Sequence, residues 1–598
     1  LVLVEGGKSS YHIAVALDAS VQDYHAAQVL QRYVKEMTGA ELRIVSDDNA
    51  LADHEIIVGF NRHVDLLDPR LRREAFGPEE FLIRTYGKRV VIVGGSPRGV
   101  LYGVNSLLTD EFGCRWFTPL LRRIPKSERL VLAPTDRRYE PPFEWRDAFF
   151  WSGIDNEWSF HNFQNKRYVQ PPLGPQQGGR GGFAWRQHTA LSLIQPDLYQ
   201  KEHPEYFWSG EGTQTRTGGF KGLGICLNHP DVAPIAAERL REVWRKNQTG
   251  DLYYCLSAMD YPSWCECDYC KAFHKQEAGG VLPDASVTWN HGADWFNFAT
   301  KVQALVLQEP NPPKISVMAY GFAPNPPAKP VMHKDMHVFY AEITACTFHR
   351  LDDPDNDWNK TFRRRLEGWL KCAGSVYVWL YKVNFSGRDG WNAGWSYINP
   401  NMHTFADDFR YLRKVGVKGV FAQGNQMAVW GKRFAGEMNE LRAYLLARLL
   451  WNPDLDWRQD RREFCAAYYG PEAGAVIEQY LDDVRDEFVK HDVQGPASLM
   501  SSRMGVLCPA ATTFSSPSRV LKAGISSEPI CPAAPVTRIL LIGSLQQSCG
   551  VDYRRSRVAS TSPHLASRWS GPAIDSRLQV SMMCHLGCYL HLKKALAP

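Results

Sequence analysis

Two acidic residues stand at or near the ends of apolar, strand-like segments, where a carboxylate can do chemistry. Asp260 ends LYYCLSAMD (252–260), and Glu342 lies in VFYAEITACTF between apolar neighbours. A carboxylate in such surroundings is costly unless it is paired or protonated, and desolvation raises its pKa towards use as a general acid. Each also has a structural interpretation: Asp260 can cap a loop, and Glu342 can form a buried salt bridge with an arginine.

Other polar and aromatic side chains follow the remaining predicted strands. Aromatic faces stack on sugar rings and amides bind hydroxyls, so together with two carboxylates this set favours a glycosidase. A glycosidase needs a proton donor and a second group that stabilises an oxocarbenium-like transition state. Glu437 opens the last predicted helix, where the helix dipole favours an acid in any case. The candidate substrate-binding residues are Trp151, His188, Asn228, Tyr320, Tyr381, Gln423, Asn425 and Glu437.

The densest motif is WCECDYCK, which follows Asp260 and contains Cys265, Cys267 and Cys270. The CxCxxC spacing is typical of a zinc knuckle, with Cys226 as a conceivable fourth ligand. The same thiols would form disulfides in an exported protein. In either case we expect a structural role, bracing the loop that carries Asp260.

Several cofactor and metal motifs are missing from the sequence. It contains no HExxH, no P-loop, no GxSxG elbow and no GxGxxG in register with an acidic ribose ligand. We therefore expect no catalytic metal and no cofactor.

These residues need a framework, and residues 140–495 alternate strand-like and helix-like segments, the pattern of a parallel βα architecture. Eight strands with intervening helices favour a (β/α)8 TIM-like barrel over an open doubly wound sheet. In such a barrel, the loops at the carboxyl ends of the strands build the active site. The predicted strands are 144–151, 183–190, 222–228, 252–260, 314–320, 337–343, 375–381 and 417–425.

The barrel is flanked by two different segments. Residues 1–135 read as a small α/β domain, with a helix whose apolar positions run from Ala26 to Met37 and which stops at Gly39. Residues 496–598 lose all periodicity and are rich in Ser, Arg and Pro, so we predict an irregular tail, disordered or arising from a shifted reading frame.

Composition limits the classes of function. The chain has 598 residues and a net charge of +5, but residues 497–598 alone hold 11 Lys or Arg against 3 Asp or Glu. The remaining body is therefore slightly acidic, and nucleic-acid binding has no electrostatic support there. No apolar stretch is long enough for a membrane span.

Seven segments carry a resemblance to known proteins. They are VVIVGGSPRGVLYGVNSLLTDEFGCRWFTP (90–119), HPEYF (203–207), CLNHP (226–230), LSAMDYPSWCECDYC (256–270), VYVWLYKVNF (376–385), VKGVFAQGN (417–425) and ELRAYLLARLLWNPDLD (440–456). In this order and spacing they resemble a family of bacterial proteins long known as a domain of unknown function and now associated with glycoside hydrolase family 163. The resemblance covers roughly residues 1–490, and the first 135 residues also resemble the domain that precedes the barrel in α-glucuronidases and β-hexosaminidases. A departure is PPLGPQQGGRGGFAW (171–185), where relatives have a shorter loop.

The resemblance implies a secreted, periplasmic or cell-surface endo-β-N-acetylglucosaminidase acting on oligosaccharides or glycoprotein glycans. It implies a retaining mechanism in which the substrate's 2-acetamido group is the nucleophile, with one acid/base and one carboxylate that orients the acetamide. The strand-end argument places Glu342 and Asp260 in these catalytic roles, without saying which does which. The alternatives are an exo-β-N-acetylhexosaminidase, an α-glucuronidase, or a carbohydrate-binding protein on an inactive barrel.

Overall fold

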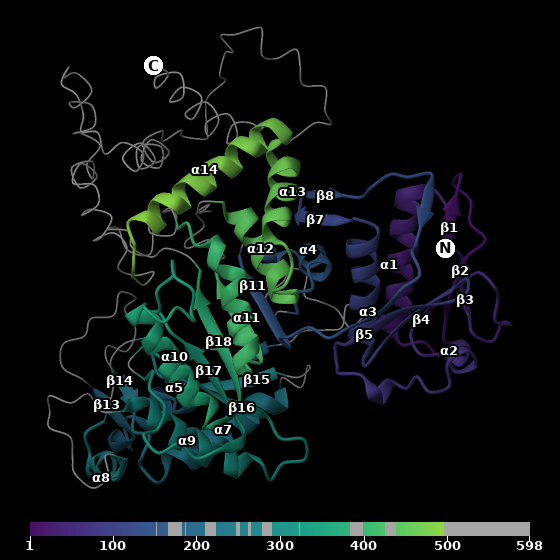
Figure 1. Cartoon of the computed structure of the whole chain (residues 1–598). Coiled ribbons are helices and arrows are strands. Elements are labelled where there is room, and N and C mark those ends of the chain that lie inside the picture. Colours follow the sequence, from purple (N-terminus) through teal and green to yellow (C-terminus); the bar gives the residue numbers. More distant parts are fainter. Residues whose placement is uncertain are drawn as a thin grey trace, which may run out of the picture.

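The computed structural model describes residues 1–150, 152–165, 182–185, 187–209, 223–246, 252–260, 265–277, 290–321, 323–382, 399–424 and 438–495. They form a small N-terminal domain and a larger part built on a curled parallel sheet (Figure 1). The predicted tail lies outside the described residues, as do the candidates Trp151, Asn425 and Glu437. Within the described ranges, every helix is too short or too polar to span a bilayer.

The N-terminal domain contains a six-stranded mixed sheet in the order β10-β5-β6-β4-β2-β3. β2, β3, β4 and β6 are parallel, whereas β5 runs antiparallel to β6, and β10 runs antiparallel to β5. Two short antiparallel pairs, β1–β9 and β7–β8, accompany the sheet. The strands are β1 (Val2–Glu5), β2 (His12–Val15), β3 (Ile44–Ser46), β4 (Glu55–Val58), β5 (Phe81–Tyr86), β6 (Arg89–Gly94), β7 (Arg115–Thr118), β8 (Leu121–Arg123), β9 (Arg129–Val131) and β10 (Asp136–Tyr139).

Helices cover both faces of this sheet. α1 (Val21–Thr38) and α3 (Pro97–Ser106) belong to the main core with Ile13, while α2 (Arg62–Leu67) packs on the other face with Ala14. The predicted helix is confirmed as α1. The Ser20 side chain caps its start by accepting a hydrogen bond from the Asp23 amide, and Gly39 ends it at φ +80°.

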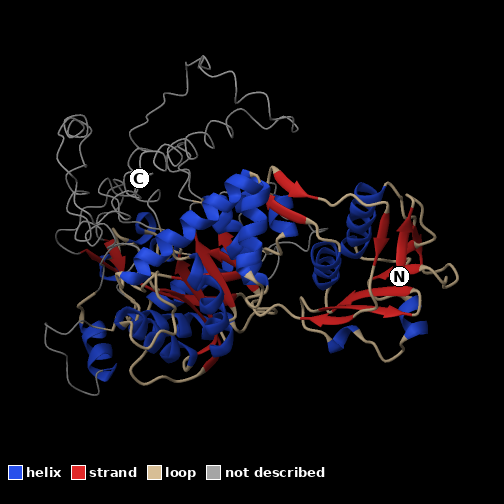
Figure 2. Cartoon of the chain, turned by 45° about the horizontal axis from the view of Figure 1, so that its top comes forward, coloured by secondary structure: helices blue, strands red, loops and turns tan. Residues whose placement is uncertain are grey.

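The second part is built on a seven-stranded, all-parallel sheet in the order β11-β19-β18-β17-β16-β15-β12. The predicted class is confirmed: a small α/β domain precedes a curled parallel sheet with helices around it (Figure 2). The strands are β11 (Trp145–Phe149), β12 (Gly182–Trp185), β15 (Leu252–Leu256), β16 (Lys314–Tyr320), β17 (His333–Ala341), β18 (Ala373–Tyr381) and β19 (Gly419–Gln423).

One predicted barrel strand lies elsewhere. Residues 222–228 were expected to join the barrel, but β14 (Leu223–Ile225) pairs antiparallel with β13 (Phe207–Ser209) in a separate two-stranded sheet. The regular part of the strand is only three residues long, and an apolar run of that length does not specify its partner. The curled sheet therefore has seven strands among the described residues.

The helices of the second part fall into two groups. Most follow the strands and pack outside the sheet, whereas α12 is buried along nearly its whole length and contacts both β11 and β7. α12 therefore joins the two parts, beside α13 and α14 (Figure 1). The helices are α4 (Asn156–His161), α5 (Ala190–Leu193), α6 (Pro196–Tyr199), α7 (Val232–Lys246), α8 (Asp268–Glu277), α9 (His291–Val306), α10 (Asp357–Leu370), α11 (Phe405–Val415), α12 (Asn439–Trp451), α13 (Trp457–Tyr469) and α14 (Pro471–Lys490).

The concave face of the parallel sheet is lined by aromatic side chains. Trp145 on β11 contacts Phe339 on β17 with ring centroids 5.4 Å apart, although β19 and β18 lie between these strands in the sheet. Only the curl of the sheet can bring such distant strands into contact. Side chains alternate along a strand, so Val338 and Tyr340 point the other way, into the core under the helices.

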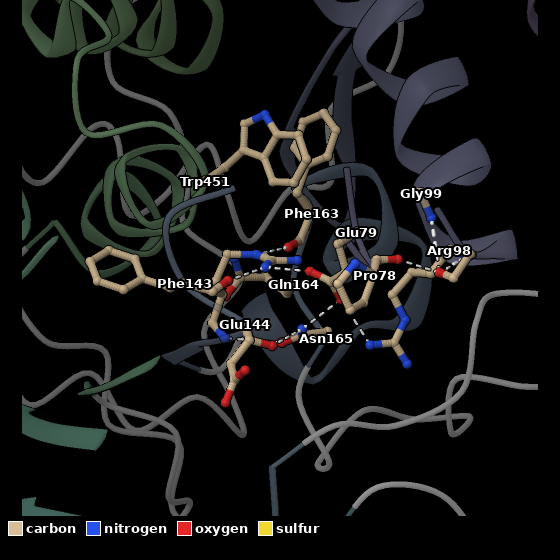
Figure 3. Close-up of polar contacts among 12 residues, drawn as sticks. Pro78, Glu79, Arg98, Gly99, Phe143, Glu144, Phe163, Gln164, Asn165 and Trp451 are labelled. Carbon is tan, nitrogen blue, oxygen red and sulfur yellow. Dashed lines mark hydrogen bonds and ion pairs between the residues drawn. The ribbon is translucent and has the colours of Figure 1, made fainter. Parts of the chain in front are cut away.

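A buried ion pair ties the first strand of this sheet to the N-terminal domain. Arg146 on β11 is fully buried, and its Nη1 lies 2.6 Å from Glu79 Oε2. Arg98 and Asn165 also bind Glu79, at 2.8 and 3.0 Å, and Arg146 Nε donates to the carbonyl of Phe163 at 2.8 Å. Figure 3 shows these contacts around Glu79. The two parts therefore meet at a bonded junction.

Candidate functional site

Three predicted site residues meet where β15, β16 and β18 end. The Tyr320 hydroxyl donates to Asp260 Oδ1 at 3.2 Å, and the Tyr381 hydroxyl donates in turn to Tyr320. Burial raises the pKa of Tyr320, and the negative charge of Asp260 raises it further. Burial raises the pKa of Tyr381 in the same way. Both hydroxyls therefore stay protonated near neutral pH and form a chain of donors that ends on the Asp260 carboxylate.

This hydrogen-bonded chain lies over the aromatic floor of the sheet. Asp260 itself is exposed, whereas Tyr381 is buried and stacks on Trp379 with ring centroids 5.6 Å apart. Trp379 Nε1 donates to Gln423 Oε1 at 2.7 Å, which fixes the side chain of another predicted site residue at the end of β19. An accessible carboxylate beside aromatic rings and an amide is chemically suited to a sugar.

His188 joins this group through a short segment that is bonded to the end of β15. Thr189 Oγ1 donates to the carbonyl of Cys255 at 3.0 Å and accepts from the Ser257 amide at 2.9 Å. His188 Nδ1 lies 3.2 Å from the carbonyl of Ala258, and its ring centroid lies 6.4 Å from that of Tyr320. Its φ of +56° is uncommon for a residue other than glycine, and such conformations concentrate at functional sites.

Glu342 occupies a different environment. It is 6% exposed and accepts hydrogen bonds from Tyr340 (2.9 Å), which belongs to the outer core, and from the Thr344 hydroxyl (2.5 Å). Its Oε2 lies 2.5 Å from Arg365 Nη1 on α10. The buried salt bridge with an arginine, one of the two interpretations of this residue, is thus present, on the helix side of the sheet.

Asn228 does not contact the Asp260 group. Its side-chain amide donates to Cys270 Sγ at 3.5 Å and to Asp294 Oδ1 at 2.9 Å, and its oxygen accepts from Asn297 at 3.3 Å. The reason is the position of β14 outside the parallel sheet, so that residue 228 does not follow a barrel strand. Asn228 instead borders the cysteine motif.

The cysteine motif closes into a cluster of four residues. The sulfur atoms of Cys226, Cys265, Cys267 and Cys270 all lie within 4.8 Å of one another, and all four thiols are free. Hydrogen bonds from Cys226 and Cys270 hold the pKa of the Cys265 thiol far below its ordinary value. The predicted fourth member, Cys226, is therefore in place, 39 residues before Cys265 in the sequence.

Asp147 is a further carboxylate beside the aromatic floor, and it lies within a strand and not at a strand end. It is 1% exposed in the middle of β11, between Trp145 and Phe149, whose side chains both lie on the concave face. Alternation along WRDAF places Asp147 on that same face. The alternation of WRDAF is the sequence signal for Asp147, because its position within the strand sets it apart from residues at strand ends.

Three solved structures are similar to this chain at low sequence identity. A family GH115 4-O-methyl-α-glucuronidase with specificity for decorated arabinogalactans is 12% identical, with a TM-score of 0.47, over 91% of this chain and 72% of that one. The GH20 β-N-acetylhexosaminidase of Streptomyces coelicolor A3(2) is 13% identical, with a TM-score of 0.44, over 79% and 92%. The β-N-acetylhexosaminidase of Bacteroides fragilis NCTC 9343 is 11% identical, with a TM-score of 0.42, over 81% and 93%.

Sequence families are more informative. No curated protein matches the sequence. Residues 6–107 match the family described as the glycosyl hydrolase family 67 N-terminus, which makes the chain glycoside hydrolase-like. Residues 116–482, more than half of the chain, match the family described as a domain of unknown function, DUF4838. The chain belongs to the DUF4838 family.

Proposed function

We propose that this protein hydrolyses β-linked N-acetylglucosamine within glycans, as an endo-acting glycosidase, with Asp260 as the carboxylate that contacts the substrate. The observation that carries the proposal is the exposed Asp260 carboxylate, bound by Tyr320 beside the aromatic floor of the sheet. The glycosyl hydrolase-type N-terminal domain supports the same class of enzyme.

The arrangement suits a reaction assisted by the substrate's own acetamide. In that reaction the acetamide oxygen attacks C1, the bond from C1 to the glycosidic oxygen breaks, and a general acid supplies the proton that the leaving oxygen takes up. The same group, now a base, then takes a proton from the water that opens the cyclic intermediate with retention of configuration. Tyr320 binds one oxygen of Asp260, and among the described residues no donor binds the other. The second oxygen can accept the acetamide N–H, which orients the carbonyl oxygen towards C1.

Glu342 takes a different role in this proposal. A general acid must reach the glycosidic oxygen, and Glu342 is 6% exposed and paired with Arg365 on the helix side. We assign it as a positioning residue that fixes the end of β17 against α10. Asp147 is the second carboxylate on the concave face, where it is buried.

Two described cations near the ends of β17 and β18 are already paired with carboxylates. Lys382, directly after β18, is buried with its Nζ 2.7 Å from Asp408 Oδ2. Arg365 is paired with Glu342. A glucuronate carboxylate needs a cation at the site, and neither of these two is available to it, so α-glucuronidase activity is the weaker candidate.

The test compares the purified protein on three substrates: an aryl β-N-acetylglucosaminide, an aryl α-glucuronide and a complex N-glycoprotein, with products identified by mass spectrometry. The expected result is release of oligosaccharides that end in N-acetylglucosamine, with the remainder of each glycan left on the protein. Cleavage of the aryl β-N-acetylglucosaminide alone would replace the endo mode by an exo-hexosaminidase. Glycan binding without turnover of any substrate would replace the enzyme by a carbohydrate-binding protein.

A further inference from the structure

The spacing of the four cysteine sulfurs matches a shared metal ion. Cys226 Sγ lies 3.6 Å from Cys267 Sγ and 3.7 Å from Cys270 Sγ. A disulfide would need about 2.05 Å between two sulfurs. Zinc–sulfur bonds of about 2.3 Å in a tetrahedron place the sulfurs about 3.8 Å apart. The observed distances agree with the second arrangement and not with the first.

The helix that carries one of these thiols has almost no hydrophobic anchorage. Of the ten residues of α8, only Cys270 and His274 are buried. A helix of this length is marginal on its own and depends on burial of an apolar face. Here the buried positions hold a thiol and an imidazole, so polar bonds through these two side chains, and not an apolar face, fix α8 to the rest of the protein.

The surroundings of the thiols resemble the outer shell of a structural metal site. Asn228 donates to Cys270 Sγ at 3.5 Å, and Asn228 is itself held by Asp294 at 2.9 Å and by Asn297 at 3.3 Å. Hydrogen bonds of this kind orient a ligand and stabilise a thiolate. The amide of Cys226 is fixed by the carbonyl of Tyr206 at 2.9 Å, which holds this more distant ligand in place.

A neighbouring group of His274, His291 and Asp294 also has the composition of a metal site. Its members are already bonded to each other, because His274 Nε2 and His291 Nδ1 lie 2.9 and 3.2 Å from the same Asp294 oxygen. These distances are those of direct hydrogen bonds. This second group therefore serves to hold α8 against α9.

We propose that Cys226, Cys265, Cys267 and Cys270 bind one structural zinc ion, which joins the segment after β14 to the start of α8. Four thiolates in a closed tetrahedron leave no position for water or substrate, so the ion is structural. The inference is independent of the proposed glycosidase activity, since it depends only on the described cysteines.

The experiment measures metal content in the full-length protein purified without added chelator, by inductively coupled plasma mass spectrometry. We expect about one zinc per chain in the wild type, and loss of that zinc in Cys265→Ser. The matched control is Cys372→Ser, a buried free cysteine outside the cluster, which keeps its zinc. Retention of zinc by Cys265→Ser would overturn the assignment.

A second measurement on the wild type guards against misfolding of the variant. Replacing the metal with Co²⁺ is expected to give thiolate-to-cobalt charge-transfer bands and the strong visible bands of a tetrahedral site. Iron in place of zinc, or disulfides between the four cysteines in the protein as isolated, would overturn the proposal. Four free thiols and no bound zinc in the protein purified without chelator would overturn it as well.

Discussion

Tyr320 donates a hydrogen bond to the Asp260 carboxylate at 3.2 Å, across the carboxyl ends of two neighbouring parallel strands. The two residues are 60 positions apart in the sequence, and the parallel register of β15 and β16 brings them to the same edge. A carboxylate fixed in this way can bind a substrate group in a defined orientation, which is what the proposed reaction needs of Asp260.

Tyr320→Phe is therefore expected to lower kcat for glycan release by about 10- to 100-fold, because a hydrogen bond to a charged group contributes about 1.5–3 kcal/mol. The substitution keeps the ring on the aromatic floor, but it removes both the hydroxyl that holds Asp260 and the acceptor of the buried Tyr381 hydroxyl. Stability should therefore fall by about 1–3 kcal/mol, and kcat is compared at a temperature where the variant is folded. The matched control is Tyr253→Phe, at the opposite end of the sheet, where the hydroxyl binds Glu144 at 3.4 Å. An equal loss of kcat in both variants would contradict the role of Tyr320.

The Glu342–Arg365 pair makes a prediction about stability. Arg365→Met should destabilise the protein by about 3–5 kcal/mol, because it leaves a buried carboxylate without its cation. The double variant Glu342→Leu, Arg365→Met should recover part of this loss, since neither charge then remains buried. Urea denaturation measures both values. Full stability of Arg365→Met would show that Glu342 is not held as an ion pair.

The junction at Glu79 predicts a dependence of stability on pH. Burial alone would raise the pKa of Glu79, but the charges of Arg146 and Arg98 outweigh it and hold the pKa below its ordinary value. A lowered pKa in the folded state means that the pair stabilises the protein above the unfolded pKa of about 4.3, and that this contribution is lost as the pH falls through the folded value. The wild type should therefore lose more stability below pH 4 than Glu79→Gln does.

Melting temperatures of both proteins between pH 3 and pH 7 check this prediction. Arg70→Met is a suitable control. The Arg70 side chain, which pairs with Asp68, is 93% exposed, and exposed ion pairs contribute about 0–1 kcal/mol. Parallel curves for the wild type and Glu79→Gln would contradict the assigned role of the junction.

Hydrophobic periodicity in the sequence predicts where most strands of the parallel sheet lie, but it does not predict which strands pair with each other. KISVMAY and SVYVWLY became β16 and β18 of the sheet, because long apolar runs between turn signals mark buried strands. β14 was misplaced, since three residues carry no information on pairing. The cluster of four cysteines could be predicted in part, because Cys265, Cys267 and Cys270 lie close together in the sequence.

The sequence predicts which residues follow the strands of the sheet, but it does not predict which other side chains surround them. Tyr320, Tyr381 and Gln423 lie where the strand ends were expected to place them, but the environment of Glu342 depended on Arg365, which is 23 residues away on α10. Alternation along β17 gave a clue: Phe339 and Ala341 line the concave face, so Glu342 continues the outer series.

The central claim is that Asp260 contacts the substrate of a glycoside hydrolase, and the most direct measurement is glycan release from a complex N-glycoprotein by Asp260→Asn. Asp335→Asn, an exposed aspartate near the opposite end of β17, is the matched control. We predict that the folded Asp260→Asn protein loses glycan release by about 100-fold or more, while Asp335→Asn keeps it. Undiminished release by Asp260→Asn would contradict the account.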